Sequence, residues 1–413
     1  MIIKRDYYLQ QLISSKSNNL IKIVTGIRRS GKSFLLFNLF HNHLIETGIS
    51  EDHIIEIALD DRLNKNLRDP DVILQHIHER IVDDKLYYII LDEVQMIDEF
   101  TDVLNSLLHI RNADVYVTGS NSKFLSKDVV TEFRGRGDEI HLFPLSFAEL
   151  YNSIGGDKFE LWKSYYTYGG LPGILELDSE KKKAAYIRSL HETVYLKDII
   201  ERNNLKNSEE FMELMRVMAS CIGSPCNPSK LENTFKSVKS ETLDRKTISK
   251  YLSYMEDAFL IEKSMRYDIK GRKYIGTLSK YYFQDIGLRN ALLNFRQVEE
   301  NHIMENVIYN ELRLRGFCVD VGMVEARTAK ERKQLEVDFV ANMADRRYYI
   351  QSAFAMPDDD KREQECASLK KIDDSFKKII IMRDDIKPYH DNNGFYIVGL
   401  MDFLLKPNLI EQL

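Results

Sequence analysis

The fold of this 413-residue chain is decided by one stretch, Gly26-Ile27-Arg28-Arg29-Ser30-Gly31-Lys32-Ser33. It fits the phosphate-binding pattern G-x-x-x-x-G-K-S/T at every fixed position. This chemistry needs glycines so that backbone N–H groups can wrap the phosphates, a lysine for the β and γ phosphate charge, and a hydroxyl for Mg²⁺. We therefore expect the loop, extended by Phe34, to bind ATP, with Lys32 also acting in catalysis.

The segments on either side of the loop support this interpretation. Residues 21–25 have the β-branched composition of a strand, and residues 34–43 repeat apolar side chains at helical spacing. The bound anion would then lie at a helix N-terminus. The helix dipole and the free N–H groups both favour negative charge there.

Two adjacent carboxylates follow a later strand, because the apolar run 87–91 ends in Asp92-Glu93. We expect Asp92 and the hydroxyl of Ser33 to hold Mg²⁺, and Glu93 to polarise the attacking water. An intervening strand at 54–59 means that the strand before the loop and the strand before Asp92 are not adjacent in sequence. With a glutamate after Asp92, this order indicates the additional-strand, catalytic-glutamate division of P-loop ATPases.

Polar residues near two further strands are candidates to complete a hydrolytic site. Thr118-Gly119-Ser120-Asn121 follows the fourth strand, and we expect Asn121 or Ser120 to contact the γ-phosphate or orient water. Arg134 and Arg136 precede the fifth strand. Arginine can neutralise the charge that develops in phosphoryl transfer, often from a neighbouring subunit of a homo-oligomer. The alternative for either arginine is a solvated turn.

Composition narrows the class of protein. The chain has 58 Lys and Arg residues against 64 Asp and Glu residues, a formal net charge of −6, which argues against coating nucleic acid through bulk charge. A local basic face stays open. The apolar runs are strand-sized, so we expect no membrane-spanning segment and no membrane partner. Four cysteines are too few for a disulfide framework, which favours a reducing, cytoplasmic location.

Short runs spread over nearly the whole chain match a known group of proteins. In the first half they are Arg5-Asp-Tyr-Tyr-Leu9, the phosphate loop, Leu91-Asp-Glu93, Gly119-Ser120 and Phe143-Pro-Leu-Ser-Phe147. In the second half they are Lys280-Tyr-Tyr-Phe-Gln-Asp-Ile-Gly-Leu-Arg-Asn290, Glu305-Asn-Val-Ile-Tyr-Asn-Glu-Leu312 and Glu336-Val-Asp-Phe-Val340. The chain thus resembles the prokaryotic AAA-superfamily ATP-binding proteins that carry a C-terminal domain of unknown function. The resemblance implies an ATPase domain, a winged-helix module and a restriction-endonuclease-like tail.

The alternation of strands and helices in the first third predicts an α/β fold, a doubly wound parallel sheet of the P-loop NTPase type. Its expected strands are 21–25, 54–59, 86–91, 115–118 and 139–142. Together with the resemblance, this pattern divides the chain into four regions. They are a P-loop ATPase core (1–146), a helical lid (147–205), a winged-helix domain (206–298) and a small nuclease-like α/β domain (299–413).

The third region contains a candidate DNA-reading element. A short helix at 229–235, a turn at 237–243 and a second helix at 244–255 give helix-turn-helix spacing. Residues 227–250 carry six basic and three acidic residues, so this part is locally positive. We expect contacts to double-stranded DNA from Lys246, Ser249, Lys250 and Ser253. The alternative is a protein-interaction or rigid inter-domain module.

The last region resembles a nuclease that has lost its chemistry. It offers Glu305 on a helix and Asp338 on a strand, but Gln351-Ser-Ala353 stands where such nucleases have Glu-x-Lys. Losing the carboxylate weakens metal binding, and alanine cannot replace the charge of the lysine. We therefore expect a degenerate domain with Glu305, Asp338 and Gln351 as vestigial site residues.

Taken together, the sequence predicts a cytoplasmic ATPase that binds Mg²⁺ and ATP. Hydrolysis would drive or gate a conformational change of the C-terminal regions, on DNA in one version of the hypothesis. Two alternatives stay open. One is a non-hydrolysing nucleotide switch or scaffold that binds protein partners, and the other is a DNA-processing factor with an active nuclease tail.

Overall fold

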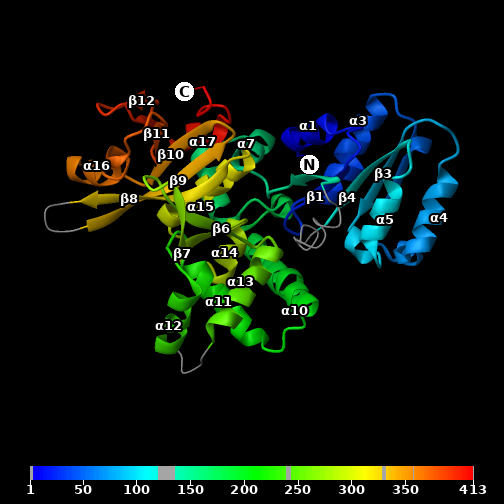
Figure 1. Cartoon of the computed structure of the whole chain (residues 1–413), viewed down its shortest axis with the longest axis horizontal. Coiled ribbons are helices and arrows are strands. Elements are labelled where there is room, and N and C mark those ends of the chain that lie inside the picture. Colours follow the sequence, from blue (N-terminus) through cyan, green and yellow to red (C-terminus); the bar gives the residue numbers. More distant parts are fainter. Residues whose placement is uncertain (1–2, 120–134, 239–242, 328–331, 357, 413) are drawn as a thin grey trace. The chain divides into compact units, whose positions relative to one another are not determined.

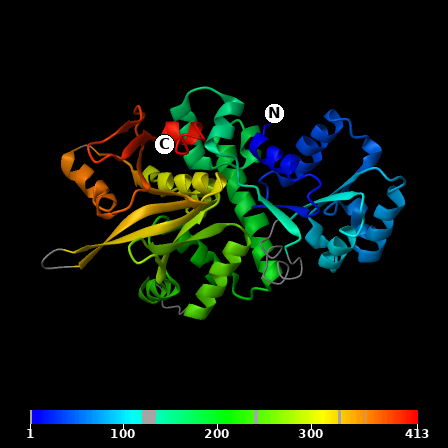
Figure 2. The same cartoon turned by 45° about the horizontal axis from the view of Figure 1, so that its top comes forward.

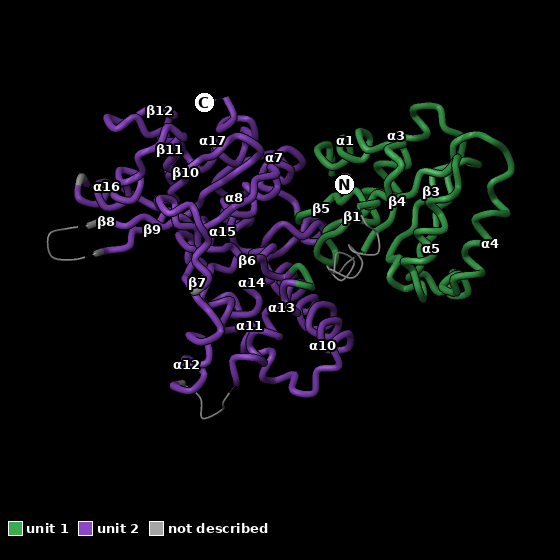
Figure 3. The backbone as a smooth tube through the Cα atoms, viewed as in Figure 1, with its two compact units in different colours: residues 1–144, 257–259 green, residues 145–256, 260–413 purple. Residues whose placement is uncertain are grey.

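The computed structural model describes residues 3–119, 135–238, 243–327, 332–356 and 358–412. The chain forms two compact units (Figure 3). Unit 1 comprises residues 1–144 with 257–259, and unit 2 comprises residues 145–256 and 260–413. No helix in these described ranges is long and apolar enough to cross a membrane. The four cysteines are free thiols.

Unit 1 is built on a five-stranded parallel sheet (Figure 1). Its strand order is β2-β3-β4-β1-β5, so β4 lies between the strand before the phosphate loop and the strand before Asp92. The strands are β1 (Ile21–Thr25), β2 (Ile54–Ala58), β3 (Tyr87–Asp92), β4 (Ala113–Thr118) and β5 (Gly137–His141). The predicted parallel α/β sheet with an additional strand is confirmed, and the strand positions agree within one or two residues.

Helices cover both faces of this sheet. Side chains of β3 alternate between the two faces. Ile89 packs with the buried residues of α4 (Pro70–Arg80) and α5 (Phe100–Leu107), whereas Ile90 packs with residues that cover the opposite face. That other face is covered by α1 (Asp6–Ser14) and by the helix after the phosphate loop. The helix after the loop is continuous through α2 (Lys32–Phe34), a π-helical segment (Leu35–Phe40) and α3 (His41–Glu46). Because strand side chains point alternately to the two faces, strands β1 to β4 each contribute to two cores.

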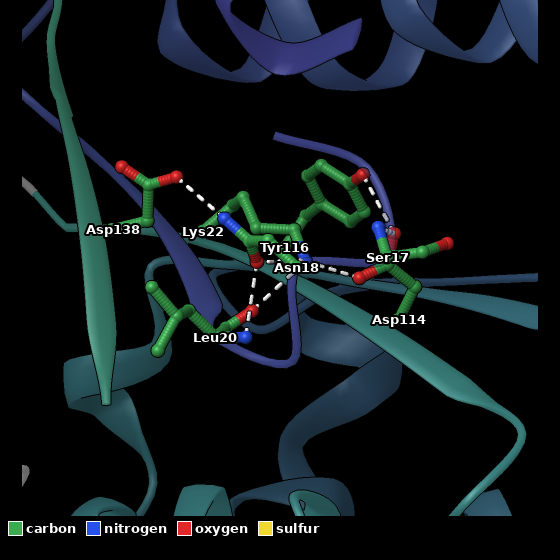
Figure 4. Close-up of polar contacts among 7 residues, drawn as sticks. All are labelled: Ser17, Asn18, Leu20, Lys22, Asp114, Tyr116 and Asp138. Atoms are coloured by element: carbon green, nitrogen blue, oxygen red, sulfur yellow. Dashed lines mark hydrogen bonds and ion pairs between the residues drawn. The ribbon is translucent and has the colours of Figure 1, made fainter. Parts of the chain in front are cut away.

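A buried ion pair stabilises the amino edge of this sheet, the edge where the strands begin (Figure 4). The fully buried Lys22 of β1 pairs with Asp114 of β4. Lys22 Nζ also donates to the carbonyl of Leu20 at 2.8 Å, and Asp114 Oδ2 accepts the Ser17 N–H at 3.0 Å and the Tyr116 hydroxyl at 2.9 Å. These bonds fix the segment that leads from α1 into β1. They satisfy two charges that would otherwise be costly to bury.

Unit 2 begins with helices. They are α7 (Phe147–Ile154), α8 (Lys158–Tyr168), α9 (Glu180–Leu190) and α10 (Lys197–Asn203), with a π-helical segment (His191–Leu196) joining α9 to α10. Helix α7 starts in a capping box: Glu149 N–H donates to Ser146 Oγ at 3.1 Å, and Ser146 N–H donates to Glu149 Oε2 at 2.9 Å. The sequence from residue 147 therefore forms the helical stretch that its periodicity predicts.

Three helices and a hairpin follow in unit 2. The helices are α11 (Ser208–Ser220), α12 (Pro228–Val238) and α13 (Arg245–Asp257), and the hairpin pairs β6 (Ile261–Asp268) with β7 (Lys273–Phe283). Cys226, between α11 and α12, forms an antiparallel bridge with Ser279 of β7. Helix α14 (Ile286–Leu292) comes next.

The hairpin belongs to the sheet of the last region. The order of this eight-stranded sheet is β12-β13-β11-β10-β9-β8-β6-β7, and β6 pairs in parallel with β8, Arg266 opposite Val321. One sheet therefore contains strands from both sides of residue 298. The remaining strands are β8 (Cys318–Arg327), β9 (Arg332–Met343), β10 (Arg346–Ala353), β11 (Lys377–Met382), β12 (Tyr389–His390) and β13 (Tyr396–Gly399).

Helices pack on this sheet as well. Helix α15 (Glu300–Leu314) crosses one face (Figure 2), where Ile308 and Leu312 pack with Phe339 of β9 and Ile350 of β10. Helix α17 (Leu400–Leu405) adds to the same core, and α16 (Asp359–Cys366) contributes Cys366 to the opposite one. The sheet is thus covered on both faces, which suits its mixed parallel and antiparallel strands.

Candidate functional site

The phosphate loop depends on two glycines for its shape. Gly26 has φ +136°, and a Cβ at this position would lie 2.2 Å from the carbonyl oxygen of Leu142. Gly31 has φ +98° and is the N-cap of the helix that follows. Both backbone conformations are ones that residues with side chains rarely adopt. The loop can therefore turn sharply out of β1 and present N–H groups at the start of the helix.

Lys32 is buried within this loop. Its Nζ donates to the carbonyl of Gly26 at 3.0 Å and to the carbonyl of Ile27 at 3.2 Å. Both acceptors are neutral backbone carbonyls of the same phosphate loop. An ammonium group held in this way can exchange carbonyl oxygens for the more strongly accepting oxygens of a phosphate.

Ser33 and Asp92 lie in contact at the carboxyl edge of the sheet. The Ser33 and Thr118 side chains both hydrogen bond to the Asp92 carboxylate, and Thr118 donates to Oδ1. Burial raises the pKa of Asp92, the two hydrogen bonds act against this rise, and the charges of Glu93 and Asp60 add to it. A buried carboxylate with acidic neighbours and an adjacent hydroxyl is a set of oxygen donors suited to Mg²⁺. The residues present therefore fit the predicted metal.

Glu93 is held by its neighbours in an unusual backbone conformation, with φ +52°. Its N–H donates to Thr118 Oγ1 at 2.9 Å, and its Oε2 accepts from the Gln95 side chain. Thr118 thus contacts both acidic residues and fixes their relative position. Sequence reasoning missed the roles of Thr118 and Gln95, although a threonine that ends the strand lying between the two site strands is a usable signal.

Arg5 supports the loop from a distant part of the sequence. Its Nη2 donates to the carbonyl of Phe143 at 2.7 Å and its Nη1 to the carbonyl of Ser30 at 3.3 Å. The guanidinium also lies over the ring of Tyr8, 4.6 Å from the centroid. The Arg5-Asp-Tyr-Tyr run, known from sequence only through the family resemblance, therefore braces the phosphate loop.

The structure does not bring the second predicted arginine to the loop. The backbone carbonyl of Arg136 accepts the Ile21 N–H at 2.9 Å, at the start of β1, and the Arg136 guanidinium donates to Asn105 Oδ1 at 3.3 Å. The loop leaves the other end of β1, roughly 16 Å away at the rise of a strand. Within one chain Arg136 and Lys32 thus lie at opposite edges of the sheet. Ser120, Asn121 and Arg134 lie outside the described residues.

The predicted DNA-contacting residues share one face of α13. The side chains of Lys246, Ser249, Lys250 and Ser253 are all exposed, whereas Ile248 and Leu252 are buried. The hydroxyl of Ser249 donates to the carbonyl of Arg245 at 2.9 Å, and that of Ser253 to the carbonyl of Lys250 at 2.8 Å. The exposed charge of this face therefore comes from its lysines.

The predicted vestigial nuclease residues meet around a lysine that sequence reasoning missed. Lys280 Nζ, from β7, lies 2.8 Å from Glu305 Oε1, 2.7 Å from Glu336 Oε1 and 3.8 Å from Asp338 Oδ1. Burial acts to lower the pKa of Lys280, but the charges of the three carboxylates raise it above its usual value. Burial, helped by the charge of Glu305, raises the pKa of Asp338, and the charge of Lys280 acts against this rise. The signal was present, because Lys280 directly precedes the aromatic run Tyr281-Tyr282-Phe283 of a strand.

The third vestigial residue stands apart from these ion pairs. The Oε1 atom of Gln351, on β10, is buried and has no hydrogen-bond partner among the residues that the structure describes. Its neighbour Ser352 donates its N–H to Asp338 Oδ2 at 2.9 Å, and Ala353 is buried. Lys361 pairs with Glu365 at 2.7 Å on its own helix. None of these residues supplies the lysine of a Glu-x-Lys motif.

Comparisons with known proteins agree with the nucleotide site. Residues 18–151 match the family described as AAA domain, and residues 159–299 match a domain of unknown function (DUF8612). An uncharacterized protein of Haemophilus influenzae is 33% identical over 98% of this chain and 99% of its own length. An uncharacterized protein of Methanocaldococcus jannaschii is 29% identical over 99% of this chain and 89% of its own length.

Solved structures are more distant. The Aeropyrum pernix ORC1 protein in complex with DNA is 12% identical over 71% of this chain and 92% of that chain, with a TM-score of 0.30. A likeness at this level carries no argument about function.

Proposed function

The chain belongs to the family of its full-length Haemophilus influenzae relative, with an AAA domain at its N-terminal end, and we propose that it is an ATPase that uses Mg²⁺. One observation carries the proposal. Asp92 at the end of β3 accepts a hydrogen bond from Thr118 at the end of β4, and Ser33, on the helix that follows the phosphate loop, is a neighbour that lowers the pKa of Asp92. This is the arrangement that a shared metal ion needs.

In this proposal each residue has one task. Lys32 leaves the carbonyls of Gly26 and Ile27 and binds the β and γ phosphates, while the loop N–H groups bind the remaining phosphate oxygens. Ser33 and Asp92 hold Mg²⁺, which when bound neutralises phosphate charge. Glu93 accepts the proton of the attacking water, and Gln95 and Thr118 keep Glu93 in position.

We further propose that the nucleotide acts on unit 2. ATP can do this only if it binds two arrangements of the protein with different affinity. The helices 147–203 follow the ATPase core directly in sequence, so they are the first elements that a change in the core would move. Arg134 and Arg136 enter the proposal as residues that act on the nucleotide of a neighbouring copy, which makes a homo-oligomer part of it.

Double-stranded DNA is the effector that we propose for α13. The order of α11, the Cys226 bridge, α12, α13 and the β6–β7 hairpin is the connectivity of a winged helix. The exposed lysines of α13 support contacts to phosphates. The β6–β7 hairpin would be the wing of such a module. Because β6 is paired with β8, this hairpin is part of the eight-stranded sheet, so α13 would contact DNA without help from the wing.

Phosphate release from ATP tests the proposal. We would compare the wild type with Lys32→Ala, Glu93→Gln and the exposed-lysine control Lys65→Ala, each with and without duplex DNA. We expect the first two variants to lose at least about 100-fold in turnover and the control to keep it. Stimulation by DNA that is lost in Lys246→Ala/Lys250→Ala and weakens with salt would support the role of α13.

Two results would redirect the proposal. A wild type that binds ATP but releases no phosphate in either condition would contradict hydrolysis and favour a nucleotide-dependent switch that binds protein partners. Turnover that DNA leaves unchanged, with no salt-dependent DNA binding, would remove α13 from the mechanism and leave the ATPase intact.

A further inference from the structure

Lys280 is a deeply buried charge of unit 2, with 3% of its side chain exposed. Glu305 comes from α15, Glu336 and Asp338 come from β9, and Lys280 comes from the hairpin strand β7. The ammonium lies within 2.8 Å of two carboxylates and 3.8 Å of the third. The three acidic side chains therefore converge on a cation that the protein itself supplies.

The nuclease-like fold expected from sequence would place a divalent metal ion among these carboxylates. We propose that Lys280 takes the place of that metal ion, so that the cluster is a metal-free ion-pair site that joins the hairpin to the last region. The acidic residues would then persist as partners of a lysine and not as metal ligands. This inference concerns unit 2 and is independent of the nucleotide site.

The hydrogen bonds explain why a metal ion does not fit beside the lysine. Glu305 Oε1 accepts from Lys280 Nζ at 2.8 Å and also from the Tyr282 hydroxyl at 2.8 Å. Asp338 Oδ2 accepts the Ser352 N–H at 2.9 Å. A metal ion binds carboxylate oxygens at about 2.0–2.6 Å, so it would compete with these donors for the same lone pairs. Its charge would also lie against the ammonium.

The backbone beside Glu305 narrows one side of the cluster, whereas Glu336 keeps 30% of its side chain exposed. A Cβ added at Gly223, after α11, would lie 3.0 Å from Glu305 Oε2. The backbone between α11 and α12 thus approaches Glu305 closely and narrows the access of solvent and ions. Among the residues that the structure describes, no group of three or more His, Cys, Asp or Glu side chains has the arrangement of a metal site.

Mn²⁺ binding by the full-length protein tests the proposal. We would measure free Mn²⁺ by electron paramagnetic resonance without nucleotide, with Asp92→Asn in every variant so that the nucleotide site does not contribute. We expect no stoichiometric binding by the parent and binding at least about tenfold tighter in Lys280→Met, because three carboxylates are then left without their cation. Lys263→Met, an exposed lysine of β6, is the matched control and should not bind.

If Lys280→Met does not fold, the parent protein, which carries only Asp92→Asn, still tests the proposal. Stoichiometric Mn²⁺ binding by the parent that is lost in Asp338→Asn would overturn the proposal, because Asn keeps the acceptor for the Ser352 N–H but not the charge. Mg²⁺-dependent or Mn²⁺-dependent plasmid cleavage that Asp338→Asn abolishes would overturn it as well. Absence of both in the parent supports it, and a folded Lys280→Met that gains no Mn²⁺ affinity counts against it.

Discussion

Lys32 and Lys280 are both buried lysines, yet their hydrogen-bond partners differ in kind. Lys32 donates to two neutral carbonyls of its own loop, whereas Lys280 forms ion pairs with side chains from two other elements. A carbonyl gives way to a phosphate at little cost, but a buried ion pair cannot be opened without leaving bare charges. The partners of a buried lysine, and not its burial, therefore decide whether it can bind a ligand.

The strongest test of this difference is the stability of unit 2 without Lys280. Lys280→Met should lower the free energy of unfolding by about 3–5 kcal/mol, because it leaves buried carboxylates uncompensated. The single tryptophan, Trp162, is buried in unit 2, so its fluorescence in urea reports this unit. Lys263→Met should change the value by less than about 0.5 kcal/mol. Equal stability of Lys280→Met and the wild type would show that the ion pairs of Lys280 do not stabilise unit 2.

His191 is a buried titratable side chain of unit 2 for which no ion pair with a carboxylate is found among the described residues. It is buried, its Nε2 has no hydrogen-bond partner among the described residues, and burial, helped by the charge of Arg216, lowers its pKa to about 4. The unfolded chain therefore binds a proton below pH 6.5 that the folded chain takes up only near pH 4. Stability is complete above pH 6.5 and falls by about 3 kcal/mol as the pH drops to 4.

The control for this pH effect is His191→Leu. The pH-dependent difference between the wild type and His191→Leu, measured by urea unfolding at pH 4 to 7, should equal this loss. Parallel curves for the two proteins would show that His191 is protonated in the folded state.

The stabilisation that bound ATP gives the protein should depend on Lys32 and not on Lys280. At an ATP concentration of 100 times its Kd, the wild type and Lys280→Met should each gain about 2.7 kcal/mol, seen as a higher melting temperature. Lys32→Met should lose most of this gain. If Lys280→Met also failed to respond to ATP, the nucleotide site and the Lys280 cluster would be energetically coupled and not independent.

The smallest expected effect concerns the loop that holds Lys32. Gly26→Ala should cost about 2 kcal/mol more than Gly48→Ala, although both glycines have positive φ. A Cβ at Gly26 meets the carbonyl oxygen of Leu142, whereas a Cβ at Gly48 meets no atom within 4 Å. Thermal unfolding of unit 1, followed by circular dichroism, gives both values. Equal costs would mean that the loop can shift away from Leu142.

Much of unit 1 follows from local sequence patterns. The loop, the strand before it and Asp92-Glu93 are short motifs whose chemistry dictates their geometry, so they could be placed without a structure. The contacts of Arg5 with Ser30 and Phe143 could not, because they join residues far apart in sequence and no local pattern records them.

Unit 2 was harder to predict for the same physical reason. The place of strand β8 in the sheet is set by its pairing with β6 and β9, which are distant from one another in sequence. The role of Lys280 likewise depends on Glu305, Glu336 and Asp338 arriving from two other elements. Tertiary contacts of this kind decide a residue's role, and local propensities in the sequence do not reveal them.

The pairing of β6 with β8 also has a consequence for synthesis on the ribosome. The hairpin is complete once Phe283 is available, but one edge of β6 stays open until residues 321–323 have emerged. An open strand edge is a template for pairing with other chains. A nascent chain that pauses between these points, or a fragment that ends near residue 298, should therefore aggregate more readily than the finished protein, and chaperones that bind unpaired strands should retain it longer.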